Sequence, residues 1–190
     1  MTRGEAVLLV IGFAVVASYS LTWLVRRYAL RHRILDHPGP RASHTRPTPR
    51  GGGLGLVIAV LATTLAVLWP RLDARSLLAL AGVVLTAGVG WLDDRRSLGV
   101  RARLLAHLVA GASLLPLALS PSPVPDWMGG VAGFWWGFWA VSAINVVNFM
   151  DGIDGLIGSQ SLIFGVHLAI QGQPGGAALA IGLSLAGTSA

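Results

Sequence analysis

The chain has 190 residues, of which 54% are hydrophobic and only 12% are charged. A soluble globular domain is excluded, because several apolar stretches approach the length of about 20 residues that a helix needs to cross a bilayer. Cysteine is absent, which excludes disulfides and thiolate metal sites, and all 14 basic residues are arginines. In a membrane protein such charge reports orientation rather than nucleic-acid binding.

Seven apolar segments follow one another and predict an all-α polytopic membrane helix bundle with about seven transmembrane helices. In order, they are residues 6–25, 53–69, 76–92, 104–119, 130–150, 156–170 and 177–190. The first is interpreted as an uncleaved span rather than a signal peptide, because it is long and Arg26 and Arg27 follow it. We expect residues 1–190 to form a single transmembrane domain.

The arginines are concentrated in two connecting segments. Residues 26–50 hold seven of them and residues 95–103 hold four, whereas the remaining three are Arg3, Arg71 and Arg75. Arginine-rich loops stay in the cytoplasm. We therefore expect the N-terminus outside, and the end of the fifth span on the cytoplasmic side.

Three polar motifs share this predicted cytoplasmic side: "DHPGPRASHTRPTPRGGG" at 36–53, "WLDDRRS" at 91–97 and "NVVNFMDGIDGL" at 145–156. Carboxylate and amide oxygens suit Mg²⁺, and arginine binds phosphate oxygens through two parallel N–H groups. Glycine-rich backbone at the start of a helix is an anion site. This composition is typical of phosphoryl transfer.

Asp93 and Asp94 are adjacent on a predicted helix and point about 100° apart, which favours two different roles over symmetric binding of one ion. Each motif alone also has a structural interpretation. The aspartates could be solvated loop charge, the glycines a turn, and Asn145 and Asn148 interhelical hydrogen-bond partners. Glycines at 129, 133 and 137 indicate close helix packing, and His107 is interpreted as a hydrogen-bonded packing residue.

Together the motifs resemble the polyprenyl-phosphate N-acetylhexosamine-1-phosphate transferases, the family of the phospho-MurNAc-pentapeptide transferase of peptidoglycan synthesis and the initiating transferases of O-antigen synthesis. The match runs from about residue 36 to residue 156. The "PRGGG" form favours the O-antigen branch over the peptidoglycan branch. The resemblance implies transfer of a sugar-1-phosphate from a UDP-N-acetylhexosamine to undecaprenyl phosphate at the cytoplasmic face of the bacterial inner membrane, with Mg²⁺ as the cofactor.

The resemblance also implies residue roles. Asp93 and Asp94 match the catalytic aspartate pair, and Asn148 matches an amide ligand of Mg²⁺. The substrate-binding residues that it implies are Arg41, His44, Arg50, Gly152, Ile153 and Asp154. The role of Asp151, a homodimer, and the choice between direct attack and a covalent intermediate stay open.

The chain ends before a later cytoplasmic loop that in this family supplies a further aspartate and a histidine-rich motif. We therefore expect it to be the N-terminal portion of a longer family fold. Two alternatives are a catalytically inactive helix bundle and a phosphotransferase of the CDP-alcohol type. The second fails on its motif, because "DGIDGL" does not match D-G-x-x-A-R.

Overall fold

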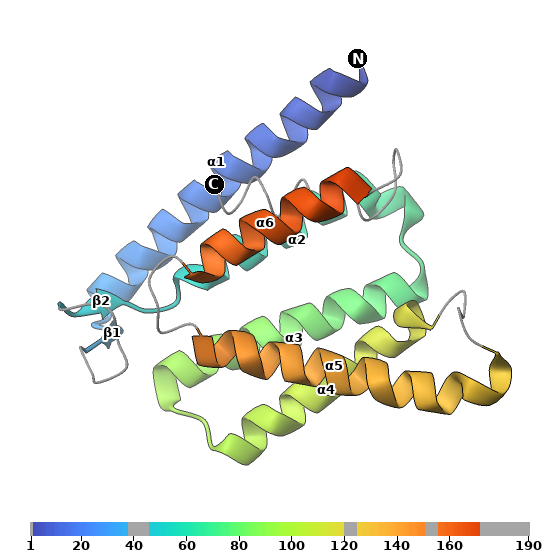
Figure 1. The fold of residues 1–190 in the computed structure, drawn as a ribbon. Helices are drawn as coiled ribbons and strands as arrows, with labels where there is room; N and C mark the ends of the chain where they lie inside the picture. Colours follow the sequence, from blue (N-terminus) through green and yellow to red (C-terminus); the bar gives the residue numbers. More distant parts are fainter. Residues whose placement is uncertain (1, 38–45, 120–124, 151–155, 172–190) are drawn as a thin grey trace. The chain divides into compact units, whose positions relative to one another are not determined.

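A computed structural model of the chain describes residues 2–37, 46–119, 125–150 and 156–171 (Figure 1). Within these ranges the backbone forms six α-helices and one two-stranded hairpin. Five helices are long and apolar enough to cross a membrane, and α6 (Leu156–Gln171) is a shorter apolar helix. The predicted all-α polytopic membrane bundle is confirmed, whereas the seventh predicted span at 177–190 lies outside the described residues.

The chain separates into two compact units, one formed by residues 1–71 and 151–190 and the other by residues 72–150. The first unit begins with α1 (Arg3–Arg31). A capping box starts this helix, since the Thr2 hydroxyl accepts from the Glu5 backbone N–H and the Glu5 carboxylate accepts from that of Thr2. Its end lies beyond the predicted residue 25, because arginine favours helix and its long stem lets the charge reach water.

A short antiparallel hairpin connects α1 to α2 (Gly52–Leu68). It pairs β1 (Leu35–Asp36) with β2 (Thr48–Pro49). The α1 and α2 helices pack closely: a Cβ atom added to Gly55 would lie 2.6 Å from the Thr22 backbone nitrogen. Only glycine permits this approach of the two backbones. A 3₁₀ turn, η1 (Trp69–Arg71), follows α2.

The second unit contains α3 (Ala74–Arg96), α4 (Val100–Ala118), the 3₁₀ turn η2 (Asp126–Met128) and α5 (Gly129–Met150). Asp73 caps α3, because its Oδ1 accepts from the Ser76 hydroxyl at 2.6 Å and from the Ser76 backbone N–H at 2.8 Å. These bonds favour the ionised carboxylate and lower the pKa of Asp73 below its usual value. The middle helix, α4, packs against both α3 and α5.

Small residues set the helix crossings of the second unit. A Cβ atom at Gly82 would overlap Ser113 Oγ and lie 3.1 Å from the Ala110 carbonyl oxygen. Between α4 and α5 the tight position is Gly111, where a Cβ atom would lie 3.0 Å from the Val141 side chain. The predicted close packing at glycines 133 and 137 is looser, with leucine carbons at 3.6 and 3.9 Å from an added Cβ.

The Gly82 crossing can be tested by substitution within α3. Gly82→Ala should lower the free energy of unfolding by roughly 1–3 kcal/mol, because the new methyl group overpacks the α3–α4 contact. Gly88→Ala is the matched control, since no atom of another described element lies within 4 Å of its added Cβ and alanine favours helix. Unfolding in mixed detergent micelles measures both. Equal stability of the two variants would contradict the close crossing.

Candidate active site

Asp93 lies in the last turn of α3 and fixes the turn into α4. Its Oδ1 accepts a hydrogen bond from the Leu98 backbone N–H at 2.6 Å. The backbone reverses through Ser97, which caps the helix with a left-handed φ of 44°. A left-handed residue other than glycine is uncommon, and the hydrogen bond to Leu98 helps to hold the chain in this shape.

The other oxygen of Asp93 pairs with the following helix. Arg103, in the first turns of α4, donates from Nη1 to Asp93 Oδ2 at 3.0 Å. The two side chains are 33% and 25% exposed, so the ion pair is only partly screened by solvent. Asp93 therefore connects α3, the turn and α4 through a single carboxylate. Sequence reasoning missed this role of Arg103, although an arginine soon after a helical turn can reach back to the preceding helix.

Asp94 lies beside Asp93 in the same helical turn and is half-buried. Regular helix geometry separates the two side-chain directions by about 100°. Trp91 lies one turn earlier in α3. The guanidinium carbon of Arg95 lies over its ring, 5.5 Å from the ring centroid. Asp93 and Asp94 therefore point in different directions from the same helical turn, and their different roles stay a prediction.

The two asparagines of the third motif lie near the end of α5. Asn145 donates from Nδ2 to the Val141 carbonyl at 2.8 Å. This bond lies within α5, so the interhelical interpretation of Asn145 is not supported. Asn148 is exposed, and its side chain has no hydrogen bond to any described residue. Its amide oxygen is therefore available to a ligand.

Asp93, Asp94 and Asn148 lie at one end of the second unit. The helices α3 and α5 both run antiparallel to α4, so both finish at the end where α4 begins (Figure 1). This end also carries Arg103. Within the described residues, no group of three or more His, Asp or Glu side chains forms a metal cluster. This end of the second unit therefore combines the oxygen donors of Asp93, Asp94 and Asn148 with arginines.

In the first unit, Arg50 is held at the start of α2. Its Nε donates to Asp36 Oδ1 at 3.1 Å, its Nη2 also contacts that oxygen, and its backbone N–H donates to the Ile34 carbonyl at 3.1 Å. Gly51 precedes α2 with a left-handed φ of 87° and offers no side-chain cap to the first N–H groups. A helix start of this kind can accept an anion.

Several predicted site residues lie outside the described parts of the chain. They are Arg41, His44, Gly152, Ile153 and Asp154. A further difference concerns His107, which is 6% exposed on α4. The sequence predicted a hydrogen-bonded packing residue, but Nδ1 of His107 has no partner among the described atoms.

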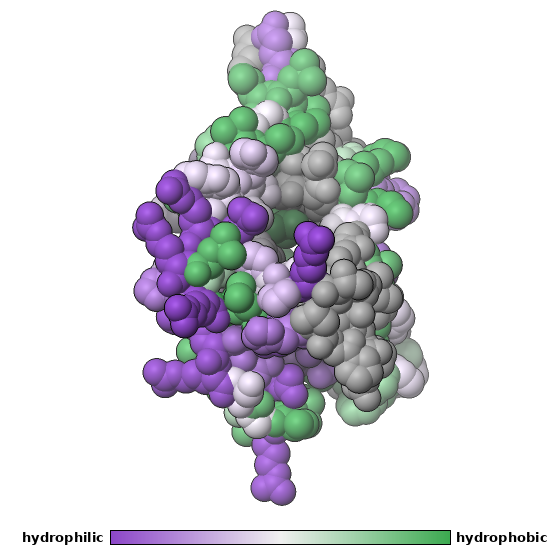
Figure 2. All heavy atoms as spheres, turned by 90° about the vertical axis from the view of Figure 1, so that its left-hand side faces the viewer, coloured by the Kyte–Doolittle hydropathy of each residue, from purple (hydrophilic) through white to green (hydrophobic). Residues whose placement is uncertain are grey.

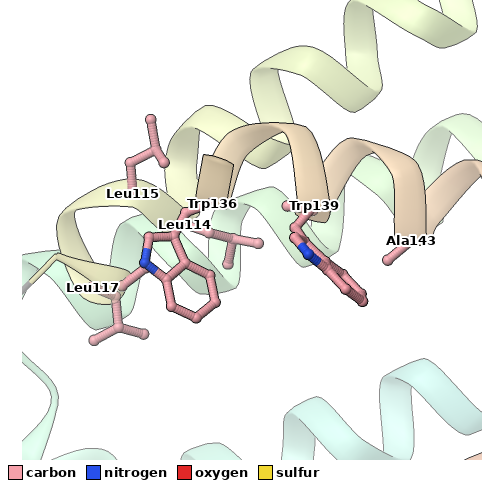
Figure 3. Close-up of a pocket in the computed structure, with 8 residues that line it drawn as sticks. Leu114, Leu115, Leu117, Trp136, Trp139 and Ala143 are labelled. Carbon is pink, nitrogen blue, oxygen red and sulfur yellow. The ribbon is translucent and has the colours of Figure 1, made fainter. Parts of the chain in front are cut away.

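An apolar cavity of about 350 Å³ lies elsewhere in the second unit, between α4 and α5 (Figure 3). Leu114 and Leu117 line it from the C-terminal half of α4, and the indoles of Trp136 and Trp139 line it from α5. Among the described residues, its lining includes no carboxylate, amide or arginine. The cavity is therefore separate from the polar end that carries the candidate chemistry.

The Asp93 contacts predict a graded loss of stability. Asp93→Ala should lower the free energy of unfolding by about 1.5–3 kcal/mol, because it removes the acceptor of two hydrogen bonds. Arg103→Ala should remove about 0.5–1 kcal/mol, as expected for a partly exposed ion pair. The control, Arg101→Ala, removes an exposed arginine of the same helix turn and should change stability by less than about 0.5 kcal/mol.

Unfolding of the three variants in mixed micelles provides the measurement. A double-mutant cycle on Asp93 and Arg103 should give a coupling energy of about 0.5–1 kcal/mol. If Arg103→Ala behaves like Arg101→Ala and the coupling is zero, Arg103 does not hold Asp93.

Comparison with known proteins places these motifs in a family. Residues 76–190 match the family described as glycosyl transferase family 4. The chain is also similar to three curated decaprenyl-phosphate N-acetylglucosaminephosphotransferases. It is 32% identical over 126 residues to that of Mycobacterium leprae (strain TN) and 30% identical over 125 residues to that of Mycolicibacterium smegmatis (strain ATCC 700084 / mc(2)155). It is 29% identical over 126 residues to that of Mycobacterium tuberculosis (strain ATCC 25618 / H37Rv).

Each of these matches covers 62% of the chain but 31% of the relative, so the chain spans about a third of the length of its relatives. The matched family region contains α3 to α6, and with them Asp93, Asp94 and Asn148. The O-antigen branch remains a prediction. The resemblance to the polyprenyl-phosphate hexosamine-1-phosphate transferases is confirmed, and the chain belongs to glycosyl transferase family 4.

Proposed function

We propose that the chain is part of an enzyme that transfers N-acetylglucosamine-1-phosphate from its UDP-linked donor to undecaprenyl phosphate or a related polyprenyl phosphate. The observation that carries this proposal is the position of Asp93, Asp94 and Asn148 at one end of the second unit, beside arginines. The names of the relatives support this acceptor class and this sugar. The "PRGGG" form of the first motif favours a polysaccharide-initiating branch, such as O-antigen synthesis, over the peptidoglycan branch.

In the proposed reaction, an oxygen of the acceptor phosphate bonds to the phosphorus that carries the sugar. The bond between this phosphorus and the UMP oxygen breaks, and UMP leaves with the electron pair. Most of the catalysis in such a transfer is positioning and neutralisation of negative charge. Carboxylates that hold a cation, together with arginines that bind phosphate, meet both needs.

We assign Mg²⁺ to the end of α5, with Asn148 as a ligand. The exposed amide oxygen of Asn148 and the half-buried carboxylate of Asp94 belong to the hard oxygen donors that Mg²⁺ prefers. Few protein ligands are required, because Mg²⁺ keeps waters and binds substrate phosphates. When bound, the ion neutralises charge on the reacting phosphates.

The two aspartates have different parts in this proposal. Asp93 keeps the α3–α4 turn in shape through Leu98 and Arg103. This places Asp94 so that its carboxylate orients the acceptor phosphate or takes its proton. The proposed substrate contacts are Arg41, His44, Arg50, Gly152, Ile153 and Asp154.

Substitutions test the proposed roles in a transfer assay. The chain is expressed alone and fused to the remaining part of the M. smegmatis relative, and labelled sugar phosphate is followed from UDP-N-acetylglucosamine into polyprenyl phosphate. Asp94→Asn and Asn148→Ala should each lower the rate by about a hundredfold or more, because they remove charge stabilisation at the transition state. Both proteins should still insert, since neither change removes apolar surface.

Asn145→Ala is the internal control for this assay. Its side chain bonds only to its own helix among the described residues, so it makes no contact to the proposed site and the transfer rate should stay within about threefold of the parent's, a free-energy difference of about 0.6 kcal/mol or less. Near-normal rates for all three variants at limiting Mg²⁺ would show that the polar end of α5 is structural.

We also propose the orientation predicted by the arginines, with the N-terminus outside and the candidate active site facing the cytoplasm of a bacterial inner membrane. The chain has no cysteine, so single cysteines can be introduced without background. Cysteines at Ser43 and Ser97 should resist an impermeant thiol reagent in intact cells, while one at Ser122 should react. The reverse labelling pattern would overturn the orientation.

A further inference from the structure

The last turns of α1 carry a concentration of uncompensated positive charge. Arg26, Arg27, Arg31 and Arg33 lie within eight residues, and the chain has no acidic residue between Glu5 and Asp36. Asp36 is already paired with Arg50. None of the four arginines forms an ion pair with a carboxylate within the described ranges. Hydrophilic residues, in purple, are prominent in the view from the side on which Figure 1 draws the β1–β2 hairpin (Figure 2).

Helix geometry directs part of this charge away from the protein core. Ala29 is fully buried, whereas Arg27 and Arg31, two residues before and after it, are exposed. Two helical residues correspond to about 200°, so both arginines lie on the face opposite Ala29. Trp23 is one turn before Arg27 on the same face and is 44% exposed.

Trp23 and Arg27 are in direct contact. The Arg27 guanidinium carbon lies 4.6 Å from the centroid of the Trp23 ring. A tryptophan ring favours the depth of the lipid headgroups, with its apolar body towards the acyl chains. The cation–π contact therefore holds the arginine charge at the same depth.

Two features of this segment are unfavourable in isolation. Arg27 and Arg31 are like charges at i and i+4, which repel each other on a helix. Arg33 has a left-handed φ of 54°, a conformation that glycine usually adopts after a helix. An anion bound beside these side chains would compensate for the repulsion.

We propose that the face formed by Trp23, Arg27 and Arg31 is a binding site for the phosphate of an anionic phospholipid headgroup. The guanidinium groups bind the phosphate oxygens, as arginine does elsewhere, and Trp23 contacts the glycerol and upper acyl region. The arginines at the end of α3 and the start of α4 differ from this group, because they lie close to aspartates and Arg103 is paired with Asp93. In clusters of basic residues next to a membrane span, each arginine raises the affinity for anionic lipid about fivefold, which corresponds to ~1 kcal/mol.

The test uses the full 190-residue chain, purified in detergent and titrated with phosphatidylglycerol or phosphatidylcholine while native mass spectrometry counts the bound lipids. The parent should bind phosphatidylglycerol in preference to phosphatidylcholine. Arg27→Gln with Arg31→Gln should weaken phosphatidylglycerol binding about 25-fold and leave phosphatidylcholine unchanged. Arg27→Lys with Arg31→Lys keeps the charge and should stay within about fivefold of the parent, with helix content checked by circular dichroism.

The matched control is Arg95→Gln with Arg96→Gln, which removes two arginines and another tryptophan contact at the end of α3. Because Asp93 and Asp94 lie beside these two arginines and offset their charge, the control should retain phosphatidylglycerol binding within about twofold. An equal loss in this control would show general charge attraction and overturn the site. A titration with polyprenyl phosphate separates the two lipid sources: if its binding falls in the glutamine variant while that of phosphatidylglycerol does not, the face serves the acceptor and the proposal is wrong.

Discussion

The hydrocarbon interior of a membrane offers no hydrogen-bond partner to the backbone, and this constraint governs where chemistry can occur in the chain. Helices satisfy their own N–H and C=O groups, so spans are helical and charged side chains gather where the helices end. Asp93, Asp94 and Arg103 follow this rule, as does the arginine group after Trp23. The proposed transfer between a water-soluble nucleotide sugar and a lipid phosphate requires a site at this boundary.

Close helix crossings determine which helix ends meet. Glycine at positions 82 and 111 lets α4 approach α3 and α5, because a Cβ atom there would meet the neighbouring helix. With α4 fixed between them, α3 and α5 finish at the same end of the unit. Two motifs separated by about fifty residues in the sequence are thereby brought to one end. The packing of the apolar helices thus brings the polar residues of the candidate site to the same end of the unit.

Periodicity and length predicted the helices well, because apolar spans follow directly from membrane thickness. They did not predict the β1–β2 pairing, since two-residue strands carry no alternating pattern. The contact between Asp93 and Arg103 was also missed, because it depends on the left-handed backbone of Ser97, which apolar patterning does not reveal. Asn145 was ambiguous for a similar reason: its sequence position does not show whether its amide turns to its own helix or to a neighbour.

The positive-inside rule assigns both arginine-rich segments to the cytoplasm. Their charges are nevertheless arranged differently. Residues 93–103, from the end of α3 to the start of α4, contain four arginines and two aspartates, and Asp93 pairs with Arg103. Their remaining positive charge is moderate and lies beside carboxylates, which suits phosphates that arrive with a divalent cation. Residues 26–33 contain four arginines and no acid, and none of these arginines forms an ion pair with a described carboxylate. In the proposal, a headgroup phosphate at the depth that Trp23 marks supplies the counter-charge to these arginines.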